Sequence, residues 1–356
     1  MYIRSTLPIL GFSATGMAAY VLEDDYGTST SFFDKFSFFT DPDPTGGFVS
    51  YVDRNTAQDT GLIFANGAVY MGVDHTNVAG SSGRQSVRLT STKSYTHGLI
   101  ILDLEHMPGG ICGTWPAFWM LGPDWPSHGE IDIIEGVNTQ PVNQMTLHST
   151  DGCSIANGGF TGTPTDIRAG TPNPTNWGPP LAKFAPGSCS FDAHFSEMQI
   201  VFDTTFCGGW AGSVWGSGSC ASLLTSNCYD YAPSQDTNAG CGIAATSSRT
   251  YGTGFNNAGG GIYATEWTSA GISIWFFPRG STVAPSCQDF VANNPSAFRE
   301  AYWLIESLKV YQDAPGESNN MRMNATSHLN VQLPRKGGRR SPGLHGRGFL
   351  EGTGKW

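Results

Sequence analysis

Three carboxylic acids, Glu130, Asp132 and Glu135, lie within six residues of one another in the segment Gly-Glu-Ile-Asp-Ile-Ile-Glu-Gly. Their isoleucine neighbours favour an extended backbone, and successive side chains of a strand point to opposite faces. Strict alternation would put Glu135 on the apolar face, where an unpaired carboxylate is costly. A one-residue bulge at 133–134 returns Glu135 to the face of the other two acids, and bulges are frequent beside active sites. We therefore predict a bulged strand that presents three acids on one patch of a sheet.

Clustered carboxyls of this kind suit the hydrolysis of glycosidic bonds, in which one acts as nucleophile and another as acid/base. Close placement gives retention of configuration, whereas wider placement leaves room for a water molecule and gives inversion. Neighbouring negative charges raise one another's pKa, which keeps one carboxyl protonated as the acid. Asp132 lies between Glu130 and Glu135, where it can tune both. The alternative for this segment is an ordinary solvated edge strand. A metal site is a weaker alternative, because no histidine pair at ligand spacing accompanies the acids.

Aromatic side chains gather near the acids. Trp115, Trp119 and Trp125 precede the acidic strand, and Trp210 lies in a glycine-rich loop. A sugar polymer needs flat apolar surfaces for its rings, although tryptophan in a β-sandwich also serves as core. In the segment Met-Thr-Leu-His-Ser that follows, His148 is the histidine that we place near the acids.

The rest of the chain reads as many short strands joined by tight turns. Only 13% of the 356 residues are charged, while glycine (46) and aromatic residues (12%) are abundant, which suits strands and turns better than helices. We predict an all-β sandwich of two antiparallel sheets. The formal charge of −10 argues against nucleic acid as a partner and is compatible with a neutral polymer. The predicted strands are 48–52, 68–73, 86–89, 98–104, 129–136, 145–149, 197–202, 261–266, 272–277 and 302–311.

The two ends of the chain differ in character from its middle. Residues 1–19 have a basic start, an apolar run too short to span a bilayer and small residues for cleavage, which predicts a secretory signal peptide. Residues 20–312 form the predicted catalytic domain, and the basic, glycine-rich segment 313–356 is predicted to be a disordered tail. No other run could cross a membrane. We expect a secreted, extracellular protein that acts as a monomer.

Eight cysteines fit disulfide bonds in an oxidising compartment. Their spacing matches no zinc-binding pattern. The pairs closest in sequence are Cys228 with Cys241 and Cys207 with Cys220, but spacing alone leaves the connectivity open.

The chain resembles glycoside hydrolase family 16, and specifically its fungal endo-1,3(4)-β-glucanases, which are laminarinase-like. The resemblance covers residues 20–312 and rests on G-E-I-D-I-I-E-G at 129–136, C-G-T-W-P-A-F-W at 112–119, D-W-P at 124–126 and M-T-L-H-S at 145–149. It implies a concanavalin A-like β-jelly-roll with an open concave cleft. It also implies retaining hydrolysis of β-1,3 or mixed β-1,3/1,4 glucan, and we expect no cofactor or metal.

The resemblance also implies roles for individual residues. Glu130 is the implied nucleophile, Asp132 its electrostatic helper and Glu135 the general acid/base. Further residues resemble substrate contacts: the stacking residues Trp119, Trp125 and Trp210, and the polar residues Arg88 and His148.

Two features depart from the family pattern. Gly209 stands where the fungal enzymes carry an aspartate in the loop of Trp210. The block from about 166 to 222 normally follows the block from about 223 to 286, and here the two are transposed.

Two other functions remain open: a cell-wall glucan transglycosylase that uses the same acids, and a non-catalytic β-glucan-binding module.

Overall fold

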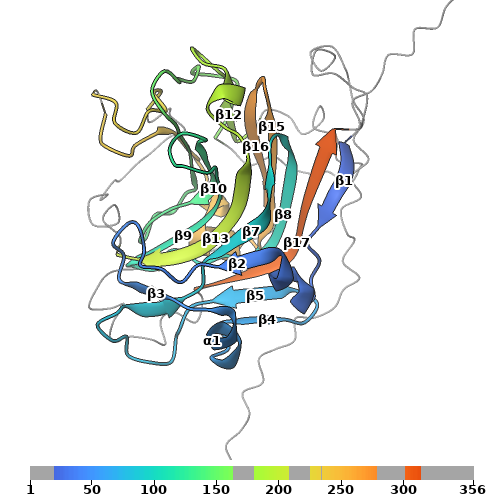
Figure 1. Ribbon diagram of the computed structural model, residues 1–356, viewed down its shortest axis with the longest axis vertical. Helices are drawn as coiled ribbons and strands as arrows, with labels where there is room; N and C mark the ends of the chain where they lie inside the picture. Colours follow the sequence, from blue (N-terminus) through green and yellow to red (C-terminus); the bar gives the residue numbers. More distant parts are fainter. Residues whose placement is uncertain (1–19, 163–179, 208–224, 234, 279–300, 314–356) are drawn as a thin grey trace, which may run out of the picture.

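The computed structural model describes residues 20–162, 180–207, 225–233, 235–278 and 301–313. Within these ranges the chain is built almost entirely of strands, which form two large antiparallel sheets packed face to face (Figure 1). The predicted fold class, a β-jelly-roll sandwich, is confirmed.

The larger sheet has eight strands, and β1 lies beside β17 outside its linear order. Its central strands β8 and β17 are long and lie side by side in the assembled sheet, although about 200 residues of sequence separate them. In spatial order the strands are β12 (Ala182–Phe184), β16 (Gly271–Pro278), β15 (Gly261–Thr268), β8 (Gly98–His106), β17 (Tyr302–Asp313), β5 (Val69–Gly72) and β4 (Ile63–Ala65), with β1 at Tyr20–Asp25.

The second sheet has seven strands and carries the acidic segment. Strands β9, β10 and β11 follow one another as a meander, while β13 inserts on the other side of β9. In spatial order the strands are β14 (Cys241–Ala244), β11 (Gln144–His148), β10 (Glu130–Glu135), β9 (Thr114–Leu121), β13 (Met198–Phe206), β7 (Leu89–Tyr95) and β2 (Phe36–Phe38). A small parallel pair joins β3 (Val49–Tyr51) to β6 (Arg84–Ser86).

The hydrophobic core fills the space between the two sheets. Alternate residues of each strand point inward, so that Phe118, Met120 and Ile131 of one sheet pack in the same cluster as Leu102 and Phe276 of the other. The intervening residues of β9, β10 and β11 point to the opposite face of the seven-stranded sheet. That face is therefore free to form a binding surface.

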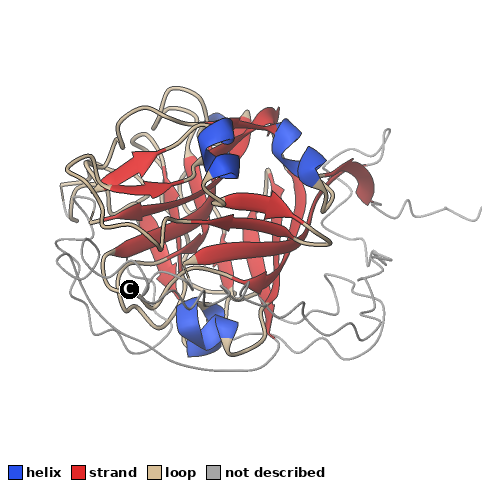
Figure 2. Ribbon diagram, turned by 90° about the horizontal axis from the view of Figure 1, so that it is seen from below, coloured by secondary structure: helices blue, strands red, loops and turns tan. Residues whose placement is uncertain are grey.

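Helices are short and peripheral. Within the described ranges the α-helices are α1 (Arg54–Asp59) and α2 (Gly252–Asn256), and Figure 2 shows the helical turns at the rims of the strand layers. Asp53 caps α1 by accepting hydrogen bonds from the backbone N–H groups of Asn55 and Thr56, as aspartate does at helix N-termini. Among the described residues, no helix combines the length and apolar character that crossing a bilayer requires.

Most of the predicted strands are present, but the predicted set is incomplete. The predicted strand 86–89 falls on the break between β6 and β7. Six strands of the two large sheets were not predicted: β1, β2, β4, β9, β12 and β14. Both blocks of the transposed region contribute strands to the large sheets: β12 and β13 come from the first, and β14, β15 and β16 from the second. The predicted signal peptide and almost all of the predicted tail lie outside the described residues.

Candidate active site

Strand β10 contains the predicted bulge. Against β11, Asp132 pairs with Thr146 and Glu135 pairs with Gln144, so three steps of β10 oppose two steps of its neighbour. Against β9 the register likewise shifts between Asp132 and Ile134. Consequently Ile133 and Ile134 are both fully buried in the core, and Glu135 returns to the face of Asp132.

Asn143 holds the bulge in place. Its side-chain carbonyl accepts a hydrogen bond from the backbone N–H of Glu135 at 2.9 Å, and its side-chain amide donates to the backbone carbonyl of Ile133 at 2.8 Å. These two backbone groups lie at the bulge, where the ladder to β11 is interrupted. Asn143 is itself fully buried, and its backbone N–H donates to the hydroxyl of Thr250. Asn143 was not among the site residues predicted from the sequence.

The three acids face one cavity of about 550 Å³ over the seven-stranded sheet. Its floor comes from alternate residues of β9, β10, β11 and β13, and its walls come from loops. The lining residues are Asp43, Pro44, Thr45, Arg88, Trp115, Ala117, Trp119, Leu121, Trp125, Glu130, Asp132, Glu135, Thr146, His148, Asp203, Thr205 and Asn238.

Glu135 lies where a proton donor can be maintained. The indole N–H of Trp115 donates to its carboxylate at 3.0 Å. Burial and the neighbouring charge of Asp132 raise the pKa of Glu135 to about 8. At neutral pH this carboxyl is therefore mostly protonated, the state that a general acid needs.

Glu130 and Asp132 share their end of the cavity with His148. One oxygen of each carboxylate and a ring nitrogen of the histidine lie within 4.8 Å of one another. Burial raises the pKa of Glu130 well above its usual range, the charge of Asp132 adds to this, and His148 opposes it. A cation at His148 therefore favours the ionised form of Glu130, the form that a nucleophile requires.

Both ring nitrogens of His148 face carboxylates. Nε2 lies 3.3 Å from Asp132, and Nδ1 lies 2.5 Å from Asp230, a fully buried residue of a distant loop. An imidazole between two carboxylates serves as a double donor, whereas a metal ligand must offer a lone pair. The group Glu130, Asp132 and His148 has the spacing of a metal site, but this donor set does not favour one. The expectation of no metal stays a prediction.

The predicted polar contact Arg88 lies on the floor of the cavity. Its guanidinium lies 3.5 Å from Asp203 and 4.9 Å from the ring centre of Trp119, at cation–π distance. Burial raises the pKa of Asp203 to about 6, although Arg88 acts against it. The result is a flat aromatic surface bordered by polar groups, which is the chemistry that a sugar ring requires.

The structure brings together seven of the eight predicted site residues. Trp125 is 38% exposed at the cavity wall, and Trp210 and Gly209 lie outside the described residues. Among the residues that were missed, Asp203 carried a signal, because an aspartate within the apolar strand Met198–Phe206 must have a buried partner. Asp230 gave no signal in the sequence, because only the folding of the chain brings it next to His148.

A family model described as "XgeA-like, catalytic GH16 domain" matches residues 36–163, 160–237 and 224–284. The endo-1,3(4)-β-glucanase of Arthroderma benhamiae is 37% identical over 375 residues, which cover 87% of this chain and 69% of that protein. Further curated fungal relatives with similar names are 32–33% identical and longer, and the chain spans 38–45% of their length.

Two solved structures are also similar. One is the GH16 Laminarinase 16A from Phanerochaete chrysosporium with two β-glucans in donor and acceptor sites. Its TM-score is 0.60 with 29% identity, and the match covers 82% of this chain and 99% of that one. The other is an elongating GH family 16 β-1,3-glucosyltransferase, with a TM-score of 0.58, 34% identity, and coverage of 83% and 100%.

Proposed function

Because this chain belongs to glycoside hydrolase family 16, we propose that it is a secreted, endo-acting enzyme that hydrolyses β-1,3 or mixed β-1,3/1,4 glucan with retention of configuration. The observation that carries the proposal is the bulge in β10, which turns Glu130, Asp132 and Glu135 into one cavity. A regular strand would place Glu135 in the core and would leave the cavity without its proton donor.

In the first step of the proposed reaction, the carboxylate of Glu130 attacks the anomeric carbon of a bound glucosyl unit. The bond from that carbon to the bridging oxygen breaks, and Glu135 gives its proton to the departing oxygen. In the second step Glu135, now ionised, takes a proton from water while the water oxygen attacks the same carbon and releases Glu130. Asp132 and His148 tune the charge of the two acids between these steps.

Several observations support the substrate class and the location. The cavity offers the rings of Trp115, Trp119 and Trp125 to a sugar polymer, and a relative named laminarinase binds β-glucans in donor and acceptor sites. The disulfides Cys153–Cys189 and Cys228–Cys241 suit an oxidising, extracellular compartment. With its net charge of −10, the enzyme acts on neutral glucan rather than nucleic acid, and we propose that it acts as a monomer.

Proton NMR of laminarin during hydrolysis tests both activity and stereochemistry. We expect new reducing ends to appear first as the β-anomer and then to equilibrate with the α-anomer, because two inversions at one carbon give net retention. Glu130→Gln should lower kcat by on the order of 10³-fold or more. Early appearance of the α-anomer would show inversion, and an unchanged rate in Glu130→Gln would exclude this residue as the nucleophile.

A second candidate function is glucan transglycosylation, which one similar structure favours, since that protein is an elongating GH family 16 β-1,3-glucosyltransferase. An acceptor sugar would then intercept the intermediate faster than water does. Chromatography of products from a single laminari-oligosaccharide separates the possibilities. Shorter products alone indicate hydrolysis, longer products indicate transfer, and an unchanged substrate indicates a binding module.

A further inference from the structure

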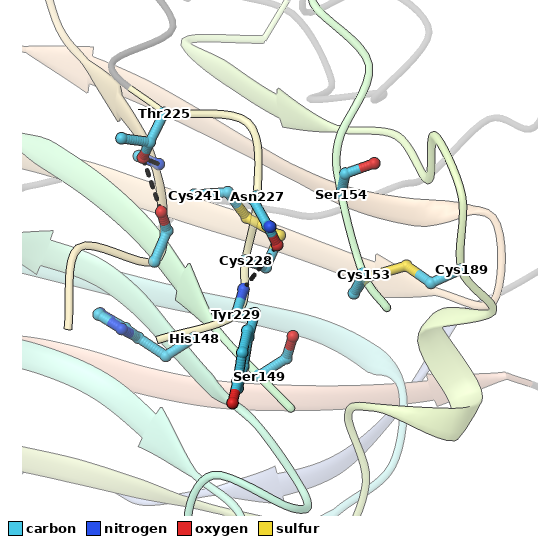
Figure 3. The surroundings of a disulfide bond; sticks show 12 residues. His148, Ser149, Cys153, Ser154, Cys189, Thr225, Asn227, Cys228, Tyr229 and Cys241 are labelled. Atoms are coloured by element: carbon cyan, nitrogen blue, oxygen red, sulfur yellow. Dashed lines mark hydrogen bonds between the residues drawn. A yellow bond between two sulfur atoms is a disulfide. The ribbon is translucent and has the colours of Figure 1, made fainter. Parts of the chain in front are cut away.

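The loop between Cys228 and Cys241 passes directly beside His148 (Figure 3). Its disulfide fixes both ends of the loop, and the backbone N–H of Ser149 donates to the carbonyl of Cys228 at 2.8 Å. The loop backbone comes so close to His148 at Gly240 that a Cβ atom added to this glycine would lie 2.9 Å from Nδ1 of the histidine. The loop is therefore held against strand β11 at the histidine.

This loop delivers Asp230 to the far side of His148. Asp230 is fully buried, and its carboxylate lies 2.5 Å from Nδ1 of the histidine. The backbone carbonyl of Asp230 accepts a hydrogen bond from the N–H of Asn238 at 2.8 Å, and Asn238 lines the cavity. One loop thus joins a cavity wall to a buried carboxylate behind the site.

We propose that Asp230 is a positioning residue, held by the Cys228–Cys241 disulfide, that keeps His148 doubly protonated and oriented toward Asp132 and Glu130. This inference rests on the proposed glucanase function, in which Glu130 must be ionised. Asp230 acts through the histidine and has no contact with the sugar.

The charges around His148 explain why it needs a second carboxylate. Burial opposes a charge on the imidazole, but hydrogen bonds with Asp132 and Asp230 raise the pKa of His148 well above its ordinary value. The titratable groups that face it are Glu130 and Asp132 from β10 and Asp230 from the loop. Strand β14 (Cys241–Ala244), next to β11, adds none, because its cysteine is in the disulfide. Without Asp230, a single ion pair would have to offset the burial of the ring.

The direct test is an NMR titration of the ¹⁵N-labelled imidazole of His148 in the wild type and in Asp230→Asn. Asparagine preserves the shape and the acceptor but removes the charge. We expect the pKa of His148 to fall by about 1 to 3 pH units, as it does when an opposite charge within a few ångströms is lost. Asp236→Asn, an exposed aspartate of the same loop, is the matched control. An unchanged His148 pKa in Asp230→Asn would overturn the proposal.

Kinetics then show whether the histidine carries the effect to Glu130. If it does, Asp230→Asn lowers kcat about 10- to 100-fold, as loss of such supporting partners does, with little change in KM. The acidic limb of kcat/KM also moves to higher pH, because Glu130 loses a nearby cation. A limb that moves to lower pH would mean that Asp230 acts on Glu130 directly. A fall in kcat without any movement of the limb would mean a merely structural role. Either result contradicts the proposal.

A double-mutant cycle completes the test. In the background of His148→Gln, adding Asp230→Asn should produce no further movement of the acidic limb, because the residue through which it acts is gone. If Asp230→Asn fails to fold, the pair Cys228→Ala/Cys241→Ala provides a second variant, and it should lower the His148 pKa in the same direction. The NMR readout needs no substrate. An inactive wild type on laminarin would therefore refute the glucanase function without deciding the role of Asp230.

Discussion

Burial raises the free energy of ionising the Glu135 carboxyl, and this keeps the carboxyl protonated. Its folded pKa of about 8 exceeds its ordinary value of 4.5, so between these values the folded state holds a proton that the unfolded chain has released. The free energy of unfolding therefore falls as pH rises through this window. The proposed acid/base residue therefore makes the native state less stable at the pH at which the proposed mechanism needs it as a proton donor.

Replacing Glu135 with glutamine should remove this dependence. We expect Glu135→Gln to raise the melting temperature at pH 7.5 clearly more than at pH 4.5, where the wild-type carboxyl is protonated in the folded state in any case. Hydrolysis should fall about 10²- to 10⁴-fold. Calorimetry at the two pH values measures the difference, with the exposed Glu197→Gln as control. Equal gains at both pH values would contradict the assigned cause.

At the scale of single elements, strand β10 depends on one side chain from outside itself. Asn143 satisfies one backbone donor and one backbone acceptor at the bulge. An unsatisfied buried polar group costs about 1–3 kcal/mol, so the bulge is stable only while this side chain is present.

Asn143→Ala should consequently reduce both stability and activity. We expect a loss of about 2–4 kcal/mol in the free energy of unfolding from the two orphaned backbone groups. We also expect a lower kcat, because Glu135 loses the hydrogen bond that fixes its backbone. Urea denaturation and laminarin assays measure the two effects, and the exposed Asn66→Ala serves as control. Normal stability in Asn143→Ala would show that the bulge holds without its clamp.

The sequence predicted features that depend on local alternation and missed those that depend on distant pairing. The bulge followed from the broken alternation at 133–134 alone. Strand β9 escaped prediction because Pro116 reads as a strand breaker. In the structure only β13 pairs with Pro116, since β10 ends at the pair of Glu135 with Ala117. Asp230 lies 82 residues from His148 in the sequence, and no local sequence pattern predicts such a contact.

On the scale of the whole molecule, two disulfides fasten different parts of the loop region beside the seven-stranded sheet (Figure 3). Cys153–Cys189 closes a span of 36 residues, whereas Cys228–Cys241 closes only 13. In the chain-entropy account a longer closed loop constrains the unfolded chain more strongly. The first bond should therefore contribute more to stability, and the second should matter more for the active site.

Paired cysteine variants test this division. We expect Cys153→Ala/Cys189→Ala to lose about 3–4 kcal/mol of unfolding free energy with a modest change in kcat at 25 °C. Cys228→Ala/Cys241→Ala should lose less stability and more kcat. Thermal unfolding and initial rates on laminarin, measured on the same samples, decide the matter. The reverse order would contradict this assignment of roles.

The bulge also determines which single-residue deletions β10 can accept without separating its acids. Counted by residue number, Glu135 is out of step with the alternation that Glu130 and Asp132 follow. The extra residue at Ile134 returns Glu135 to the same face. Deleting Ile134 would leave the three acids at alternate positions of a regular strand, so all of them would still face the cavity. Deleting Ile131 would instead make Glu130 and Asp132 neighbours, and one of the two would point into the apolar interior. The position of a single in-frame codon deletion in this strand therefore decides whether the acids stay together.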